Sequence, residues 1–166
     1  MTATTVHGEH PAAPLDKPTR LVTAALVVAV FGLAASIPAA EGGPVAMLFG
    51  WGVPLGAIAL GYGMSPRGYR IEPSGQLRVL RRVFGSKQLR VESAQRTATL
   101  LGAGGLRLAG SGGVFGWYGW FWRRETGRYR AYVTDRSRLV ACHGPDGLII
   151  VSPEDPEAFI AAVGTP

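Results

Sequence analysis

Cysteine is almost absent from this sequence. The single thiol, Cys142, cannot form an internal disulfide or supply a cluster of thiolate metal ligands. The chain therefore does not require an oxidising compartment, and the reducing side of a membrane fits it better. His7 and His10 lie close together near the start, but a histidine pair without a third ligand does not make a metal site. The sequence predicts no metal and no cofactor.

Charge is also scarce, at 17% of the residues, and the scarcity is local. Between Leu21 and Pro66 the only charged residue is Glu41. From Arg67 onward the chain has 15 Lys and Arg against 8 Asp and Glu, a net charge of +7. The sequence thus divides into an apolar first part and a basic second part that resembles a soluble domain.

The familiar catalytic and nucleotide-binding patterns are missing as well. Cys142 and His143 are the only tempting nucleophile pair, with Asp135 as a third member. Neighbours on a strand point to opposite faces, so this pair would not meet, and the chain is predicted not to be an enzyme. The high pI, near 10.1, could suggest nucleic acid. No nucleic-acid module is recognisable, and membrane topology also produces basic segments, so no nucleic-acid partner is expected.

Residues 1–20 are polar and contain three prolines without hydrophobic periodicity, which predicts a disordered cytoplasmic tail. The next 20 residues, 21–40, carry no charge. This is the length that an α-helix needs to cross a hydrocarbon core of about 30 Å, and it is too long for the apolar region of a signal peptide, which has roughly 7–15 residues. The alternative is a buried helix of a soluble protein.

A second uncharged run predicts another transmembrane helix at about 44–64, so that residues 21–66 form a helical hairpin. Pro54 should kink this helix. The spacings Gly52-x-x-x-Gly56 and Ala57-x-x-x-Gly61 suit close contact with the first helix, and they could also serve a homo-oligomer.

Basic residues flank the hairpin at both ends, and the connecting turn has only Glu41. By the positive-inside rule, Lys17, Arg20, Arg67 and Arg70 predict that both termini are cytoplasmic. We therefore expect a multi-pass protein of the plasma membrane. Its basic part would lie close to the inner leaflet of the lipid bilayer.

Beyond Gly68 the hydrophobic period changes to two, which predicts about seven short strands in a small barrel or sandwich. The end of the chain differs. Ser152 followed by Pro153 is typical of a helix start, and Phe159, Ile160 and Val163 share one face of the helix that follows. Gly164 is suited to its C-terminal cap.

Three of the four tryptophans lie within residues 110–130, among several glycines and before a cluster of arginines. So aromatic a segment must be buried in a core, in a bilayer surface or in a partner. A small barrel needs large side chains, which favours a structural role and a position against the two helices.

The later motifs are similar to those of a bacterial pleckstrin-homology (PH)-like family. The pattern consists of a strand that begins at a glycine, followed by a helix start of the form SP-x-DP-x-x-F. Its residues here are Gly127, Tyr129, Tyr132, Thr134, Ser152, Pro153, Asp155, Pro156 and Phe159. The resemblance implies an α+β fold over residues 67–166, with a seven-strand, partly open β-barrel capped by a C-terminal α-helix.

This resemblance implies a non-catalytic binding or scaffolding module at the membrane. The candidate contacts to anionic lipid headgroups or to the interface are Arg67, Arg70, Arg123, Arg124, Trp120 and Trp122. The alternative is that the arginines form a solvated rim. The loop from Pro73 to Gln76 lacks a basic residue, which argues against an inositol-phosphate pocket between the first two strands. A second hypothesis is recognition of a protein partner through an open sheet edge or through the helices.

Overall fold

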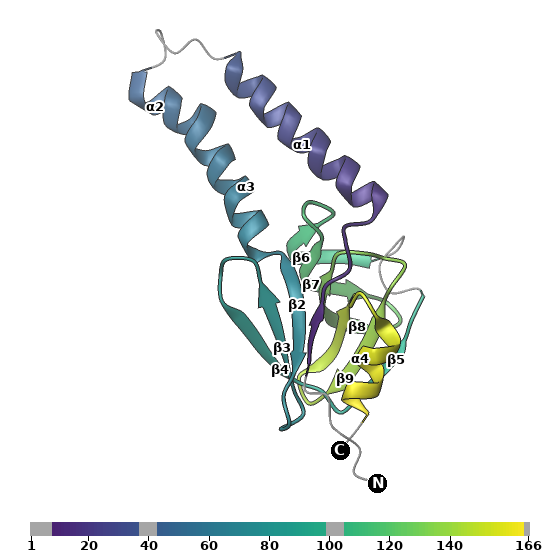
Figure 1. Ribbon diagram of the computed structural model, residues 1–166. Coiled ribbons are helices and arrows are strands. Elements are labelled where there is room, and N and C mark those ends of the chain that lie inside the picture. The colour runs from purple at the N-terminus through teal and green to yellow at the C-terminus, as the bar shows by residue number, and fades with distance from the viewer. Residues whose placement is uncertain (1–7, 37–42, 99–104, 165–166) are drawn as a thin grey trace.

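The computed structural model describes residues 8–36, 43–98 and 105–164, and places two apolar helices on one side of a β-domain (Figure 1). The first helix is α1 (Lys17–Ala35). The second runs through α2 (Gly43–Met47), a π-helical segment (Leu48–Gly52) and α3 (Val53–Met64). A short helix, α4 (Pro156–Val163), closes the chain. The class is therefore mixed α and β, as expected.

Helix α1 begins four residues earlier than the sequence predicted, because Asp16 caps it and Pro18 lies in its first turn. The predicted end at Ala40 lies outside the described residues. The expected kink at Pro54 stays a prediction, but a π-helical segment lies directly before it, where the Val53 amide donates to the Leu48 carbonyl. Pro54 has no N–H to donate to the preceding turn, which accounts for the irregular backbone.

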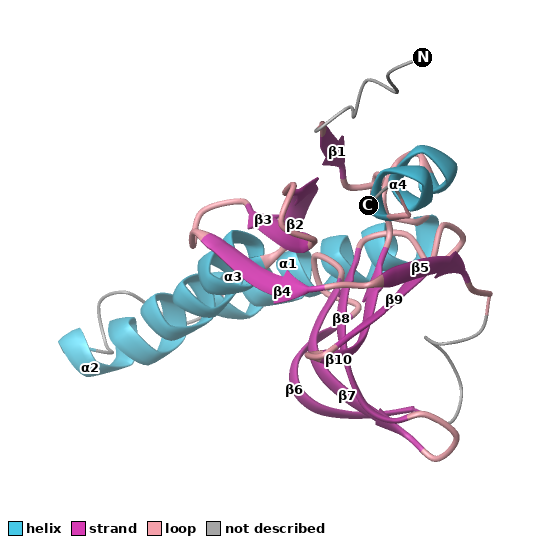
Figure 2. Ribbon diagram, turned by 90° about the horizontal axis from the view of Figure 1, so that it is seen from below, coloured by secondary structure: helices cyan, strands magenta, loops and turns pink. Residues whose placement is uncertain are grey.

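Two sheets make up the β-domain (Figure 2). The four-stranded sheet has the order β1-β2-β3-β4 and the six-stranded sheet the order β5-β9-β10-β8-β7-β6. The strands are β1 (Glu9–Pro11), β2 (Pro66–Ile71), β3 (Gln76–Arg81), β4 (Ser86–Arg90), β5 (Ser93–Arg96), β6 (Gly105–Gly112), β7 (Trp117–Arg123), β8 (Gly127–Val133), β9 (Val140–Gly144) and β10 (Gly147–Val151). All pairs are antiparallel except β8 with β10.

This arrangement differs from the predicted seven-strand barrel. The described strands form two sheets and are more numerous than the seven of the predicted partly open barrel, and the aromatic segment is itself the strand β7. The glycines between the bulky side chains concealed the alternation of β7, since glycine is unfavourable in an ordinary strand.

The prediction of a disordered tail over residues 1–20 is wrong for residues 8–20. Strand β1 pairs with β2, and the Ala12 and Ala13 amides bond to the carbonyls of Arg67 and Ser152. Ala13 is buried, because this segment is bonded to residues in or next to both sheets before it enters α1. A low-complexity composition did not reveal these backbone contacts, which depend on a partner strand far along the chain. Residues 1–7 lie outside the described residues.

The core lies between the sheets. Its largest buried side chains from the first sheet are Tyr69, Leu77 and Val79, which face residues of β8, β9 and β10. Phe159 of α4 is fully buried against Tyr69, so the C-terminal helix does close one end, as expected. Its N-cap is Asp155 rather than Ser152, and Gly164 follows its last turn. A second apolar cluster on the other face of the larger sheet includes Phe121 and Tyr129.

The two apolar helices contribute little to this core. Leu21 and Val28 on α1 are each 71% exposed, and Val45 and Phe49 on the second helix are 68% and 66% exposed. Both helices are long and apolar enough to cross a membrane. A core helix of a soluble protein would bury these side chains, which makes that alternative a poor fit to the structure.

The glycines of the two small-residue spacings do not pack against α1 as predicted. A Cβ at Gly61 would be in contact with Tyr118 and Phe115 of the β-domain. A Cβ at Gly56 would meet open space, and one at Gly52 would meet only Leu48 of its own helix. The Gly52-x-x-x-Gly56 face therefore does not contact α1, contrary to the prediction.

Gly119 and Gly110 lie opposite each other in the β6–β7 pair, both with positive φ, and Gly119→Ala should destabilise the domain. A Cβ at Gly119 would overlap the Ala109 carbonyl oxygen in a backbone conformation that alanine avoids. We expect a loss of about 2–4 kcal/mol, measured by thermal unfolding of the full chain in detergent. Gly32→Ala, inside α1 with open space around it, is the control. Equal unfolding temperatures for the two variants would contradict this packing.

A basic cleft at the base of the helices

A loop of the larger sheet fixes the β-domain to the apolar helices. This loop joins β6 to β7 and reaches both helices at once. The Phe115 amide donates to Thr23 Oγ1 of α1 at 3.0 Å, and the Tyr118 hydroxyl donates to the Gly61 carbonyl of α3 at 2.5 Å. The Phe115 ring also packs edge-on against Tyr62, with centroids 5.5 Å apart. The aromatic segment therefore positions the domain against the helices, as the sequence suggested.

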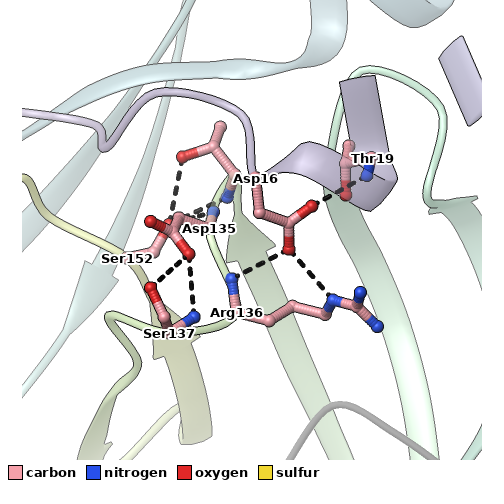
Figure 3. Close-up of polar contacts among 7 residues, drawn as sticks. Asp16, Thr19, Asp135, Arg136, Ser137 and Ser152 are labelled. Atoms are coloured by element: carbon pink, nitrogen blue, oxygen red, sulfur yellow. Dashed lines mark hydrogen bonds and ion pairs between the residues drawn. The ribbon is translucent and has the colours of Figure 1, made fainter. Parts of the chain in front are cut away.

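A second contact holds the start of α1 (Figure 3). Asp16 accepts hydrogen bonds from the Thr19 amide at 2.8 Å and from Arg136 Nε at 3.0 Å. Burial alone would raise the pKa of Asp16, but the hydrogen bonds from Thr19 and Arg136 outweigh it and hold this pKa below its ordinary value. Asp16 is therefore a carboxylate at neutral pH, and it ties α1 to the loop after β8.

A basic cleft lies next to these contacts, between the open sides of the two sheets. On the core-facing side of β3 the successive residues are Leu77, Val79 and Arg81. On the same side of the paired strand β4 they are Leu89 and Lys87. The core residues of both strands are thus followed by a cation on the same face. We call the cavity at this position the basic cleft. It has a volume of about 310 Å³ and is lined by Met64, Arg81, Lys87, Tyr118, Trp120 and Arg130, among others.

The larger sheet supplies the opposite wall in the same way. Tyr118 and Tyr132 face the core, and Trp120 and Arg130 follow them as a cross-strand pair on the same face. The Arg130 guanidinium lies over the Trp120 ring, 4.4 Å from its centroid. The tryptophan thus orients an arginine towards the space between the sheets.

The cations of the basic cleft are uncompensated. Within the described ranges, Arg81, Lys87 and Arg130 form no ion pair with a carboxylate. The Nε atom of Arg81 is buried, and it has no hydrogen-bond partner in the part of the chain that the structure describes. Three cations around one cavity repel one another, and a buried donor without a partner is unfavourable. An anion in the cleft would relieve both.

The residues that the sequence singled out for headgroup contact are not gathered at this place. Arg70 pairs with Glu9 at 3.1 Å and Arg123 with Glu125 at 2.8 Å, so local carboxylates already balance both arginines. Arg67, Arg124 and Trp122 are exposed. Of the predicted set, only Trp120 lines the basic cleft.

Sequence reasoning missed Arg81, Lys87 and Arg130. A signal was present, because each continues the inward-facing alternation of an apolar strand. A charge at an inward position is unusual and indicates either a partner or a site. The signal could not be used without knowing where the core ends along each strand, which depends on how the two sheets pack.

The C-terminal motif residues have structural roles. Ser152 Oγ accepts from the Thr134 amide at 2.8 Å, and Thr134 Oγ1 donates to the Ala13 carbonyl at 2.5 Å. Pro153 forms a bridge with Ala12, and Asp155 caps α4. These contacts hold the segment that leads from β1 into α1. Gly127, with φ of 69°, begins β8, and Tyr129 is buried in that strand.

A family model described as bacterial PH domain matches residues 69–165. The chain belongs to the bacterial PH domain family. The match covers β2 to α4, whereas β1 and the apolar helices precede it. No curated protein and no solved structure matches the chain. The match confirms the family resemblance drawn from the sequence.

PH domains are generally non-catalytic binding modules. The environment of the candidate nucleophile Cys142 is consistent with this. Cys142 is fully buried in the core of the PH domain, and this burial raises the pKa of its thiol to about 12. His143 is exposed on the other face of β9, as the strand alternation predicted. Asp135 instead receives hydrogen bonds from the Ser137 amide and hydroxyl. The three side chains thus do not form a catalytic group.

Replacing Asp16 should loosen the PH domain from α1. Asp16→Ala removes the helix cap and leaves Arg136 without its carboxylate, with an expected cost of about 1–3 kcal/mol in thermal unfolding at pH 7. Because the folded pKa of Asp16 is lowered, its contribution is complete above the unfolded pKa of about 3.9 and is lost as pH falls through the lower folded value. The difference between wild type and Asp16→Ala should therefore shrink at acid pH.

Arg70→Ala is the matched control, because it breaks an exposed ion pair and should cost only about 0.5 kcal/mol. Equal losses for both variants at pH 7, or a difference that does not depend on pH, would contradict the role given to Asp16.

Proposed function

We propose that this protein is an integral membrane protein whose PH domain binds anionic lipid headgroups at the inner face of the plasma membrane, without catalysis. The observation that carries the proposal is the basic cleft, whose cations Arg81, Lys87 and Arg130 lack carboxylate partners among the described residues. The cleft touches Met64, the last residue of α3, so it opens beside the point where the second apolar helix ends.

The expected topology supports the same proposal. Lys17 and Arg20 lie in the first turn of α1, and Arg67 follows α3, so cations mark both helix ends that adjoin the PH domain. Arg82 bonds to Ser65 Oγ at 3.1 Å and its guanidinium lies 5.0 Å from the centre of the Tyr62 ring. Aromatic and basic residues at one level are typical of a membrane interface. We infer that both termini are cytoplasmic.

The contacts of Arg67, Arg124 and Trp122 with the interface remain part of the proposal as peripheral contacts. They are exposed, and Trp122 is 40% exposed. The basic cleft is nevertheless the better headgroup site, because its cations come from both sheets and surround one cavity. Anionic headgroups attract a nearby Lys or Arg by about 1 kcal/mol each at the membrane surface.

A second candidate function is recognition of a protein partner. Strand β6 is an edge strand that pairs only with β7 among the described strands, and Leu106 and Leu108 on it are 60% and 45% exposed. An extended peptide could pair with this edge. Such binding would not depend on the cations of the cleft, which separates it from the lipid proposal.

Charge removal in the cleft tests the lipid proposal. The full chain is extracted from bilayers with equal amounts of phosphatidylcholine and phosphatidylglycerol, and the retained lipids are measured by native mass spectrometry. Wild type should be enriched in the anionic lipid. Arg81→Ala and Lys87→Ala should each reduce this enrichment about fivefold, because each removes one headgroup contact.

Arg90→Ala is the matched control, since Arg90 is exposed on the opposite face of β4 from Lys87. It removes the same charge and should leave the enrichment unchanged. No enrichment in wild type, or equal effects of Lys87→Ala and Arg90→Ala, would refute the headgroup site. Loss only in Arg124→Ala would move the site to the exposed rim.

A further inference from the structure

The basic cleft adjoins an apolar gap between the two helices. This gap has a volume of about 460 Å³ and is lined by Leu26 and Val30 of α1 and by Ala57 and Ile58 of α3, among others. Met64, Gly110 and Tyr118 line both cavities. An apolar space among the helices thus joins a cationic space among the strands at one shared wall.

The two cavities differ in polarity as the two parts of a phospholipid do. The gap is lined mainly by apolar side chains, with Arg107 and Ser111 of β6 also in its wall. The basic cleft carries Arg81, Lys87 and Arg130. An acyl chain is apolar, and the phosphate joined to it is anionic. Both cavities are within or near the size range of about 300–1,000 Å³ that is typical of ligand sites.

The helices leave the gap open for a structural reason. Phe31 and Trp51 pack edge-on across the two helices, with ring centroids 6.2 Å apart. Nearer the PH domain, Phe115 of the loop between β6 and β7 bonds to α1, and Tyr118 of β7 bonds to α3. These contacts hold the two helices at two levels, and the gap lies between the helices.

We propose that this combined site holds one anionic glycerophospholipid, with an acyl chain in the gap between α1 and α3 and its phosphate in the basic cleft. This inference rests on the headgroup binding proposed above and adds the lipid's orientation and its dependence on the chain. Charge complementarity selects this occupant, because a neutral lipid would leave the three cations and the buried Nε of Arg81 unpaired. A soluble phosphate compound would leave the apolar gap unused.

Ala57→Phe tests the position of the acyl chain. A phenyl ring at this position fills the gap, whereas Ala59→Phe adds the same ring to an exposed position of α3 that does not line it. Each full-length variant is purified from phosphatidylglycerol-containing bilayers, and bound long-chain lipid is counted by native mass spectrometry. Wild type and Ala59→Phe should retain one anionic lipid per chain. Ala57→Phe should reduce the retained fraction about tenfold, since the acyl chain loses its packing surface.

A water-soluble short-chain phosphatidylglycerol, with six-carbon acyl chains, probes the cleft alone through tryptophan fluorescence. Its binding should be unchanged in Ala57→Phe and should fall about fivefold in Lys87→Ala. The unfolding temperature of each variant shows whether it is folded, and Val30→Phe repeats the test from α1 if Ala57→Phe is not.

The outcomes separate the two proposals. If Ala57→Phe and Val30→Phe retain the long-chain lipid as wild type does, the acyl-chain site is refuted while headgroup binding stands. If the lipid retained by wild type is as often neutral as anionic, the paired site is also refuted. If Lys87→Ala leaves the binding of the short-chain lipid unchanged, the headgroup proposal itself fails.

Discussion

The hydrogen bond from the Tyr118 hydroxyl to the Gly61 carbonyl joins the two halves of this molecule. It depends on a close approach of α3 to the β-domain, because a Cβ at Gly61 would already be in van der Waals contact with Tyr118 and Phe115. The Phe115 bond to Thr23 and the Asp16 contact with Arg136 then fix α1 to the same domain. The PH domain is therefore held in one orientation relative to the helices, instead of being carried on a free linker.

This orientation explains why cations occupy core-facing positions at one end of the strands. The core ends along β3, β4, β7 and β8 at the side near α3, and there the apolar series of each strand gives way to Arg81, Lys87, Trp120 and Arg130. In an isolated domain these charges would only weaken the interior. Beside helices that are apolar enough to cross a membrane, they are placed as the proposed binding of anionic headgroups requires. The structure thus brings a basic cleft next to two apolar helices.

Much of this architecture could be predicted from the sequence, for identifiable reasons. The two apolar helices follow from the absence of charge between Leu21 and Pro66, and the terminal motif around Asp155 and Phe159 indicated the PH domain that the family match confirms. Strand β1 could not be predicted, because its stability comes from pairing with β2 across about 60 residues of chain. The basic cleft was missed for the same reason: strand alternation reveals which residues share a face, but the packing of two sheets decides where the core ends.

The central claim is that the PH domain and the apolar helices form one rigid body. Spin labels at Val28 on α1 and Gln88 on β4, both exposed, would measure this by pulsed electron paramagnetic resonance in lipid nanodiscs. Native Cys142 is fully buried and should resist labelling. We expect a single narrow distance distribution, which broadens when Tyr118→Phe and Asp16→Ala remove the two contacts. A broad or multiple distribution in the wild type would show that the domain moves freely relative to the helices, and would refute the rigid arrangement.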